Sequence, residues 1–346
     1  MGGDHGCGVA IDGVKLALAA NARITELFLV GHEAEIKSAL HRAHCHDPRL
    51  KTVHASEVLT MDDKPVVGLR KKKDCSILRA VELVKDGKAD AVISPGNTGG
   101  IYAAATIRLR TLAGVSRGAI ATVIPAPDNE FVLLDSGASV ECKPWYLAEF
   151  AIMGSIYARE ILGVKHPRVG ILSNGTEDNK GTELTLEALK ICRKLDLNFV
   201  GNVEGHGLFA NQVDVVVCDG FVGNIVLKTC ESMAQGMFSW LKRELMQNSK
   251  RRLGALLAKN AFRTIKHRLD TDNYGGAPLL GLNGIVIKVH GSAGERAFMN
   301  AIRLASESVG QNINHIIARE MAHAAPCLEE AKQALLAEAP EVVVTA

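Results

Sequence analysis

The segment Ser-Pro-Gly-Asn-Thr-Gly-Gly at residues 94–100 is the part of this chain best suited to hold a phosphate group. It follows an apolar run at residues 89–93 and precedes an alanine-rich run at residues 101–107, which predicts a strand, a glycine loop and a helix. Such a loop directs backbone N–H groups and the positive end of a helix dipole at one point. The spacing matches neither common glycine motif for dinucleotides or nucleoside triphosphates. An anion site and an ordinary capped turn are the two interpretations.

Two histidines lie in glycine-rich turns that could place them for proton transfer. His5 follows Asp4 in a Gly-Gly-Asp-His-Gly sequence, and His290 comes directly after a predicted strand at residues 284–289. An imidazole oriented by a neighbouring group can act as a general acid, a general base or a donor to an oxyanion. The alternative interpretations are a capping Asp4 beside an exposed His5, and a structural role for His290.

Two further polar loops follow predicted strands. Residues 173–181 contain Asn179 and Lys180 at a helix entrance, where an ammonium group suits a phosphate or the oxyanion of a tetrahedral intermediate. Residues 218–224 contain Asp219 and Asn224. Open parallel sheets bind ligands at the carboxyl ends of their strands, so we expect these loops to share one cleft with residues 94–100. Capped turns without a ligand are the alternative.

Two basic segments suggest contacts with an acidic carrier protein or a membrane. Residues 70–73 are four consecutive cations, and residues 240–270 carry nine Lys or Arg against two acidic residues, a net charge of +7. Apolar residues spaced by four in the second segment predict a basic amphipathic helix that can lie on an anionic bilayer. A solvated charge run and a helix packed on the body or on a second subunit are the alternatives. The predicted contact residues are Arg70, Lys71, Lys72, Lys73, Arg251, Arg252, Leu253, Leu256 and Leu257.

The bulk properties of the chain indicate a cytoplasmic α/β protein. Its 346 residues are 47% hydrophobic, enough for a large core, and the net charge of +2 argues against nucleic acid as a partner. The eight cysteines form no Cys-x-x-Cys pair, as expected of free thiols in a reducing compartment. The sequence shows no signal peptide and no apolar run of about 18 residues, the length of a membrane span.

Short β-branched runs alternate with helical patterns, which predicts right-handed crossovers and a largely parallel sheet. We expect residues 1–325 to form a single α/β domain with a helical excursion at residues 238–275, and residues 326–346 to be a peripheral tail. Residues 1–6 have the character of a loop after a strand, so we expect either a frayed start or a first strand upstream of Met1. Strands are predicted at residues 27–30, 89–93, 118–124, 131–134, 168–172, 198–201, 213–218 and 284–289, and helices at residues 9–20, 76–85, 143–162, 181–195 and 224–245.

Taken together, the motifs resemble the PlsX-type phosphate acyltransferases of bacterial phospholipid synthesis. The resemblance extends from residue 1 to about residue 310 and rests on six ordered motifs besides the Gly-Gly-Asp-His start. These are Arg-Lys-Lys-Lys-Asp-Cys-Ser at 70–76, Ser-Pro-Gly-Asn-Thr-Gly at 94–99, Asn-Lys-Gly-Thr-Glu at 179–183, Gly-Asn-Val-Glu-Gly at 201–205, Asp-Gly-Phe-Val-Gly-Asn at 219–224 and Lys-Val-His-Gly at 288–291. The family usually carries a strand before the Gly-Gly-Asp-His loop and small residues in place of Pro95 and Gly100.

This resemblance implies a reaction in which long-chain acyl-ACP (acyl carrier protein) and inorganic phosphate give acyl phosphate and free ACP. The product would feed a glycerol-3-phosphate acyltransferase, a possible partner. The resemblance also implies a homodimer at the inner face of the cell membrane. The implied fold is a three-layer αβα sandwich akin to phosphotransacetylase and isopropylmalate dehydrogenase, with a protruding amphipathic helical segment. We expect neither a cofactor nor a metal.

In that reaction phosphate is the nucleophile, so no activated Ser or Cys is needed. Backbone N–H groups of residues 97–99 and the Asn97 side chain would hold phosphate, and Lys180 would neutralise phosphate or the oxyanion. His5 or His290 would donate to the oxyanion or protonate the thiolate. The predicted catalytic residues are Lys180, His5, His290 and Asp219, and the predicted phosphate- or substrate-binding residues are Asp4, Gly96, Asn97, Thr98, Gly99, Asn179 and Asn224.

Two other functions fit the same sequence. A CoA-dependent phosphotransacetylase would share the fold and the phosphate chemistry, and a non-catalytic membrane-associated scaffold for lipid enzymes would share the basic segment. A dehydrogenase is less favoured because the sequence shows neither a nicotinamide fingerprint nor clustered aspartates for a metal-bound hydroxyacid.

Overall fold

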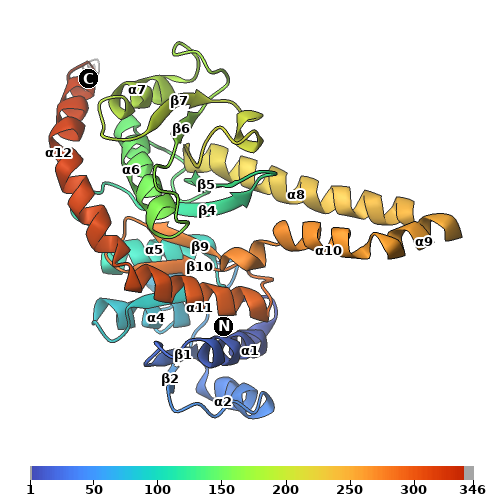
Figure 1. Ribbon diagram of the computed structural model, residues 1–346. Coiled ribbons are helices and arrows are strands. Elements are labelled where there is room, and N and C mark those ends of the chain that lie inside the picture. The colour runs from blue at the N-terminus through green and yellow to red at the C-terminus, as the bar shows by residue number, and fades with distance from the viewer. Residues whose placement is uncertain (1, 339–346) are drawn as a thin grey trace, which may run out of the picture.

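A computed structural model describes residues 2–338 of the chain (Figure 1). Within this range a small parallel pair of strands, β1 and β2, lies apart from an eight-stranded sheet. The strands are β1 (Leu27–Gly31), β2 (Leu50–His54), β3 (Ala91–Ser94), β4 (Ala119–Pro125), β5 (Glu130–Leu134), β6 (Val169–Leu172), β7 (Phe199–Val203), β8 (Val215–Val217), β9 (Ala277–Leu280) and β10 (Ile285–Lys288). All eight predicted strands are present, whereas β2 and β9 were not predicted.

Strand direction changes in the middle of the large sheet, whose order is β3-β10-β9-β4-β5-β8-β6-β7. β3 and β10 are parallel, and so are β5, β8, β6 and β7. β9 is antiparallel to both of its neighbours, and the β4–β5 hairpin is antiparallel. The sheet is therefore mixed and mostly parallel, with two parallel groups that run in opposite directions. The expectation that all site loops share one carboxyl edge is wrong for this reason.

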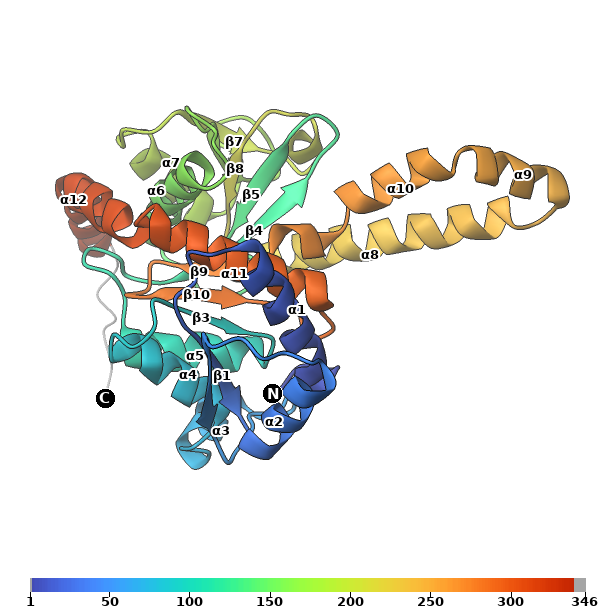
Figure 2. The same cartoon turned by 60° about the horizontal axis from the view of Figure 1, so that its bottom comes forward.

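Helices cover both faces of the sheet, which confirms the predicted three-layer α/β architecture (Figure 2). On β3 and β10, α4 and α5 pack on one face and α11 on the other, while α6 packs against β5, β6 and β8. The helices are α1 (Gly6–Ala20), α2 (Glu33–Arg42), α3 (Pro65–Lys71), α4 (Ser76–Lys85), α5 (Thr98–Leu109), α6 (Pro144–Glu160), α7 (Glu183–Cys192), α8 (Gly220–Leu245), α9 (Ser249–Leu257), α10 (Lys259–Arg268), α11 (Glu295–Gly310) and α12 (Ile313–Glu338).

α6 is the central helix of the core. It is apolar on all sides, and most of its residues are buried, which is typical of a helix enclosed by other elements. Phe150, Met153 and Ile156 belong to the same hydrophobic cluster as residues of β5, β6, β8, α11 and α12. One apolar layer therefore spans both parallel groups and joins the two halves of the sheet into one body.

α8, α9 and α10 form a hairpin that protrudes from the body (Figure 2). α8 has 26 residues, of which only Gly220 and Gly223 are buried, and α9 and α10 have no buried residue. At 1.5 Å per residue α8 is about 39 Å long. The hairpin occupies the region of the excursion predicted at residues 238–275 but begins earlier, where α8 leaves the sheet.

The C-terminal helix α12 packs along α6 and continues through Pro326. Leu328 and Ala331 are buried in the main hydrophobic cluster. The boundary predicted between residues 325 and 326 therefore falls inside one helix, and residues 326–338 are part of the packed body. Residues 339–346 of the predicted tail lie outside the described residues.

The central helix α6 carries a buried carboxyl group. Glu149 of α6 is 3% exposed and accepts hydrogen bonds from the backbone N–H of Ser116 at 2.8 Å and from its Oγ at 2.7 Å. Burial raises the pKa of Glu149 to about 7, although the two Ser116 donors oppose the shift. The folded protein therefore holds a proton there that the unfolded chain has already lost.

We expect the Glu149→Gln variant to gain stability over the wild type as pH rises. The carboxyl ionises near pH 4.5 when unfolded but near pH 7 when folded, so the wild type loses folding free energy across this window. The difference reaches at most about 3 kcal/mol. Urea unfolding at several pH values between about 5 and 8 measures it, and a difference that does not vary with pH would contradict the raised pKa.

Candidate functional site

The loop between β3 and α5 presents free backbone donors. Asn97 caps α5, with its Oδ1 accepting the Gly100 N–H at 2.9 Å. Across residues 2–338, the N–H groups of Thr98 and Gly99 meet no hydrogen-bond acceptor. Because these groups lie at the positive end of α5, they are available to an anion.

The Asn97 side chain serves the protein rather than a ligand. Its Nδ2 donates to the carbonyl groups of Thr60 and Met61 at 3.1 Å and of Asp63 at 3.3 Å. These carbonyls belong to residues 58–65, which we call the strap. Since both ends of the Asn97 amide are occupied, this side chain is not free to bind a phosphate.

The strap is also held by one of the four consecutive cations. Lys72 Nζ lies 2.6 Å from Asp63 Oδ2 and donates to the carbonyl of Val58 at 2.9 Å. The Lys72 hydrogen bond, with those from Thr60, lowers the pKa of Asp63 to about 2. Lys72 is thereby engaged within the body, whereas its neighbours Arg70, Lys71 and Lys73 are exposed.

A buried lysine lies beside the glycine loop. Lys288 of β10 pairs with Ser94 of β3 in the sheet, and its Nζ donates to the carbonyl of Pro95 at 3.3 Å and to that of Val289. It is 9% exposed, and burial lowers its pKa to about 8 despite the nearby Asp4. Sequence reasoning did not select Lys288 as a site residue. The available signal was a single cation inside an apolar strand.

The N-terminal loop packs onto the turn after β10. The Asp4 N–H donates to the carbonyl of Gly291 at 2.9 Å, and His290 Nδ1 lies 2.7 Å from Ser292 Oγ. His5 is exposed at the start of α1 and has no side-chain capping hydrogen bond. Asp4 and His290 thus lie near the end of the strand that carries Lys288, and Ser292 orients His290.

A second cluster forms around Asp135, directly after β5. This carboxylate is fully buried and accepts N–H groups from Ile120, Gly137, Ala138 and Ser139 at 2.7–3.1 Å. Burial raises its pKa, and the four backbone donors oppose the shift. The carboxylate therefore fixes a tight loop at residues 135–139.

Asp219 is the N-cap of α8. Its Oδ1 accepts the N–H groups of Phe221 and Val222, each at 3.0 Å. In the structure Asp219 therefore caps a helix, as in the alternative of a capped turn without a ligand. Because the cap starts α8 at the end of β8, Asp219 fixes where the following Asn224 lies.

α8 begins in direct contact with the Asp135 loop. A Cβ atom at Gly223 would lie 1.9 Å from the Asp135 carbonyl oxygen, so no larger residue fits there without a shift. Gly137 has a positive φ of 140°, and a Cβ at this position would lie 3.6 Å from Asn224 Cβ. Asn224, which is exposed, therefore borders the loop that Asp135 shapes.

Lys180 lies on the loop between β6 and α7. The buried Asn202 of β7 holds this loop by donating from Nδ2 to the carbonyl groups of Glu177 at 2.9 Å and Lys180 at 3.3 Å. The Lys180 side chain is exposed, and its ammonium group has no hydrogen-bond or ion-pair partner in the described part of the chain. Asn179 beside it is also exposed.

Two of these clusters border α8. Asn224 on its second turn borders Gly137, and the positive charge of Lys228 one turn later helps to lower the pKa of Lys288. Figure 2 shows α8 leaving the body between the two parallel groups of strands. The loop that carries Lys180 lies on the same side as the start of α8, because β6 and β8 are parallel neighbours. Within residues 2–338 no hydrogen bond links the Lys180 loop to Asn97 or Asp219.

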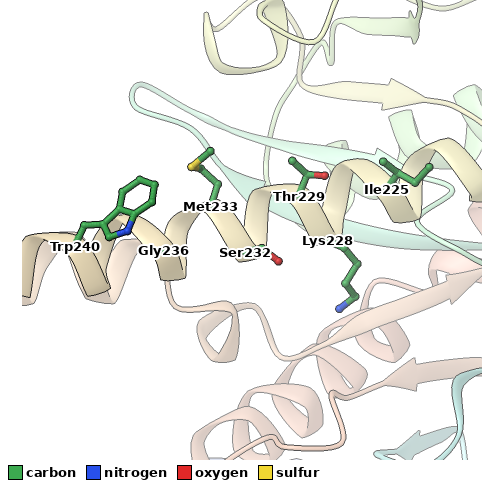
Figure 3. Close-up of a pocket in the computed structure, with 7 residues that line it drawn as sticks. All are labelled: Ile225, Lys228, Thr229, Ser232, Met233, Gly236 and Trp240. Atoms are coloured by element: carbon green, nitrogen blue, oxygen red, sulfur yellow. The ribbon is translucent and has the colours of Figure 1, made fainter.

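A shallow groove of about 580 Å³, largely open to solvent, lies along the exposed part of α8, which supplies all of its lining residues (Figure 3). It begins one residue after Asn224, and its apolar side chains include the exposed Ile225, Met233 and Trp240. The lining residues are Ile225, Lys228, Thr229, Ser232, Met233, Gly236 and Trp240. The groove therefore leads from the candidate site toward the tip of the hairpin.

The tip of the hairpin is both basic and apolar. Leu253, Leu256 and Leu257 of α9 are 59%, 65% and 82% exposed. Arg251 pairs with Glu244 at 2.7 Å, and Arg252 donates to the carbonyl of Met246 at 3.0 Å. Three large leucines in water are costly unless another surface covers them.

Residues 2–338 contain no group of three His, Cys, Asp or Glu side chains arranged to hold a metal ion. None of the helices in this range has the length and apolar character needed to cross a bilayer.

Known proteins resemble this chain in sequence or in fold. Residues 1–316 match the sequence model of a family described as "Fatty acid synthesis protein". A phosphate acyltransferase of Akkermansia muciniphila is 44% identical over 328 residues, 93% of this chain and 94% of that protein. One of Pelotomaculum thermopropionicum is 46% identical over 309 residues, 89% of this chain and 90% of that protein.

Among solved structures, a phosphotransacetylase from Streptococcus pyogenes aligns with a TM-score of 0.58 over 87% of this chain and 93% of its own. At 19% sequence identity this likeness shows the fold alone. The sequence relatives, by contrast, are close enough to define the family. The chain belongs to the fatty acid synthesis protein family of phosphate acyltransferases.

Proposed function

We propose that this phosphate acyltransferase transfers a long-chain acyl group from acyl carrier protein to inorganic phosphate. The observation that carries the proposal is the buried Lys288 ammonium beside the free N–H groups at the start of α5. A buried cation and a helix N-terminus both stabilise a phosphate dianion, and neither has a carboxylate hydrogen-bonded to it among the described residues.

The chemistry needs positioning and charge rather than a protein nucleophile. A phosphate oxygen attacks the thioester carbonyl carbon, and the tetrahedral oxyanion then collapses with cleavage of the C–S bond. Lys288 and the N–H groups of Thr98 and Gly99 hold the phosphate, while Lys180 reaches over to stabilise the oxyanion. His290, oriented by Ser292, protonates the departing thiolate.

The groups around this centre have supporting roles. Asp4 balances the charge of Lys288, His5 lies at the rim as the second candidate proton donor, and Asn224 adds a polar contact from α8. The thiols of Cys142 and Cys218 are unsuited to attack, because burial raises the pKa of Cys142 to about 12 and raises that of Cys218 well above its usual range.

The partners follow from the charge and the exposed apolar surface. The acidic carrier protein docks on the exposed Arg70, Lys71 and Lys73. The acyl chain enters the groove on α8, which a second copy of the chain closes by packing on the hairpin. The acyl phosphate then passes to an enzyme that acylates glycerol 3-phosphate at the membrane.

The hairpin tip attaches the enzyme to the inner face of the cell membrane. Leu253, Leu256 and Leu257 enter the headgroup region, and the surrounding cations pair with anionic lipids, each at roughly 1 kcal/mol. An attached enzyme releases a reactive acyl phosphate close to the surface where lipid is made.

The reaction itself is the first test. Purified protein with acyl carrier protein thioester and inorganic phosphate should form acyl phosphate, whereas acetyl-CoA should give none. Lys180→Ala should lower turnover roughly 100-fold, as the loss of an oxyanion donor does. Lys165→Ala, at an exposed position outside the site, is the matched control. Absence of acyl phosphate from the wild type would reject the proposed reaction, and wild-type turnover of Lys180→Ala would remove Lys180 from it.

The pH dependence tests Lys288. Its pKa of about 8 means that the ammonium charge is lost as pH rises through 8. We therefore expect kcat/KM for phosphate to fall about tenfold per pH unit above that value. In Lys288→Arg, whose guanidinium stays charged, this decline should disappear. Steady-state assays from about pH 6.5 to 10 measure kcat/KM for phosphate in both proteins. The same decline in the wild type and in Lys288→Arg would exclude Lys288 as its cause.

Membrane attachment is tested by sedimentation with vesicles that contain phosphatidylglycerol. The double variant Leu256→Ser/Leu257→Ser should bind at least about tenfold more weakly, because each buried leucine side chain contributes roughly 1.5–3 kcal/mol. Ile107→Ser, which changes an exposed apolar residue on the body, should bind as the wild type does. Equal binding by the double variant would refute insertion of the tip.

A further inference from the structure

The segment before β4 carries an arginine for which the proposed mechanism has no role. Arg117 is exposed, and its Nε donates to Ser139 Oγ at 3.2 Å. Ser139 is fully buried at the end of the loop fixed by Asp135, and its carbonyl accepts the Gly220 N–H at 2.8 Å. The guanidinium is therefore anchored to the loop from which α8 starts.

The residues on both sides of Arg117 are fixed as well. Ser116 is bound to Glu149 through its N–H and its Oγ, and the Gly118 carbonyl accepts the Tyr102 hydroxyl at 3.2 Å. The backbone of this segment is thus tied to α6 on one side and to α5 on the other. A side chain on such a segment loses little further freedom when it binds a ligand.

Among the described residues, Arg117 also lacks the acidic partner that Arg168 and Arg159 have. Arg168 pairs with Asp214 at 2.9 Å, and Arg159 pairs with Glu320 at 2.6 Å. For Arg117, the Nη1 and Nη2 groups meet no acceptor among residues 2–338. Anchoring through Nε leaves both terminal groups free, an arrangement suited to bidentate binding of a phosphate.

Two phosphate groups take part in the proposed reaction, and the structure separates their binding groups along α8. Gly220 borders the Arg117 anchor, whereas Lys228, eight residues later, is close enough to Lys288 for its charge to lower the Lys288 pKa. Eight residues of helix span about 12 Å. In the proposed function, Lys288 and the start of α5 already bind inorganic phosphate. The second phosphate group is the one on the donor's pantetheine arm, at the end farthest from the thioester.

We propose that Arg117 binds the phosphate group of the phosphopantetheine arm that carries the acyl thioester, with Ser139 and Glu149 as its positioning residues. This inference rests on the proposed function. It gives the site an anchor at the distal end of the arm, which directs the thioester toward the phosphate held at Lys288.

The test compares two donors that differ by one phosphate group, acyl-4′-phosphopantetheine and acyl-pantetheine. The wild type should have a KM roughly 10- to 100-fold lower for the phosphorylated donor, as expected of charge-assisted hydrogen bonds. Arg117→Ala should lose this preference while keeping the wild-type KM for inorganic phosphate. Arg117→Lys keeps the positive charge but loses the planar guanidinium that can bind a phosphate in a bidentate way. This variant should retain only part of the preference for the phosphorylated donor.

Arg303→Ala is the matched control, because Arg303 pairs with Glu307 on α11 away from the site, and it should keep the full preference. A rise in KM for inorganic phosphate with the donor preference intact would assign Arg117 to the other phosphate and overturn the proposal. An unchanged donor preference in Arg117→Ala would overturn it too.

Direct binding separates this inference from the proposed function. Calorimetry with 4′-phosphopantetheine alone needs no turnover, and Arg117→Ala should bind it at least about tenfold more weakly than the wild type and Arg303→Ala. Equal affinity would reject the role of Arg117. Failure of the wild type to form acyl phosphate would instead reject the proposed function and leave the binding result to stand by itself.

Discussion

The candidate site depends on one buried carboxylate. Asp135 is fully buried at the end of β5, where an isolated charge is costly, and four backbone N–H groups compensate that cost. Three of these come from the loop that follows Asp135, so satisfying the charge also fixes the shape of the loop. α8 starts against this loop at Gly220 and Gly223, and from there it sets the positions of Asn224 and Lys228. A single electrostatic requirement thus determines where the helix enters the site.

The reversal of strand direction determines which residues each half of the sheet contributes to the candidate site. A fully parallel sheet would bring every strand end to one edge, whereas here β9 and the β4–β5 hairpin separate two groups of opposite direction. The first group brings Lys288, His290 and the α5 loop, and the second brings Asp135, Asp219 and Lys180. The proposed site draws a buried cation from one half and an exposed cation and a shaped loop from the other.

The sequence predicted the strong local patterns of this structure and missed what depends on distant residues. The apolar runs of β3, β5, β8 and β10 and the helix of α6 were evident from composition. β9 contains Pro278 and has only four residues, so it gave little strand signal, and with it the reversal of direction went unseen. The glycine loop was located correctly. That the Asn97 side chain clamps the strap required knowing that residues 60–63 return over α5.

α8 runs unbroken from the Asp219 cap to Leu245, so one helix links the hairpin tip to the loop that Asp135 shapes. The number of helical turns in α8 sets the distance between that loop and the tip. Inserting or deleting a turn in the exposed part of α8 would change this distance by about 5.4 Å and leave the contacts of Gly220 and Gly223 with the loop intact. The length of this helix sets how far the tip lies from the body, and evolution can change that length independently of the residues proposed for the chemistry.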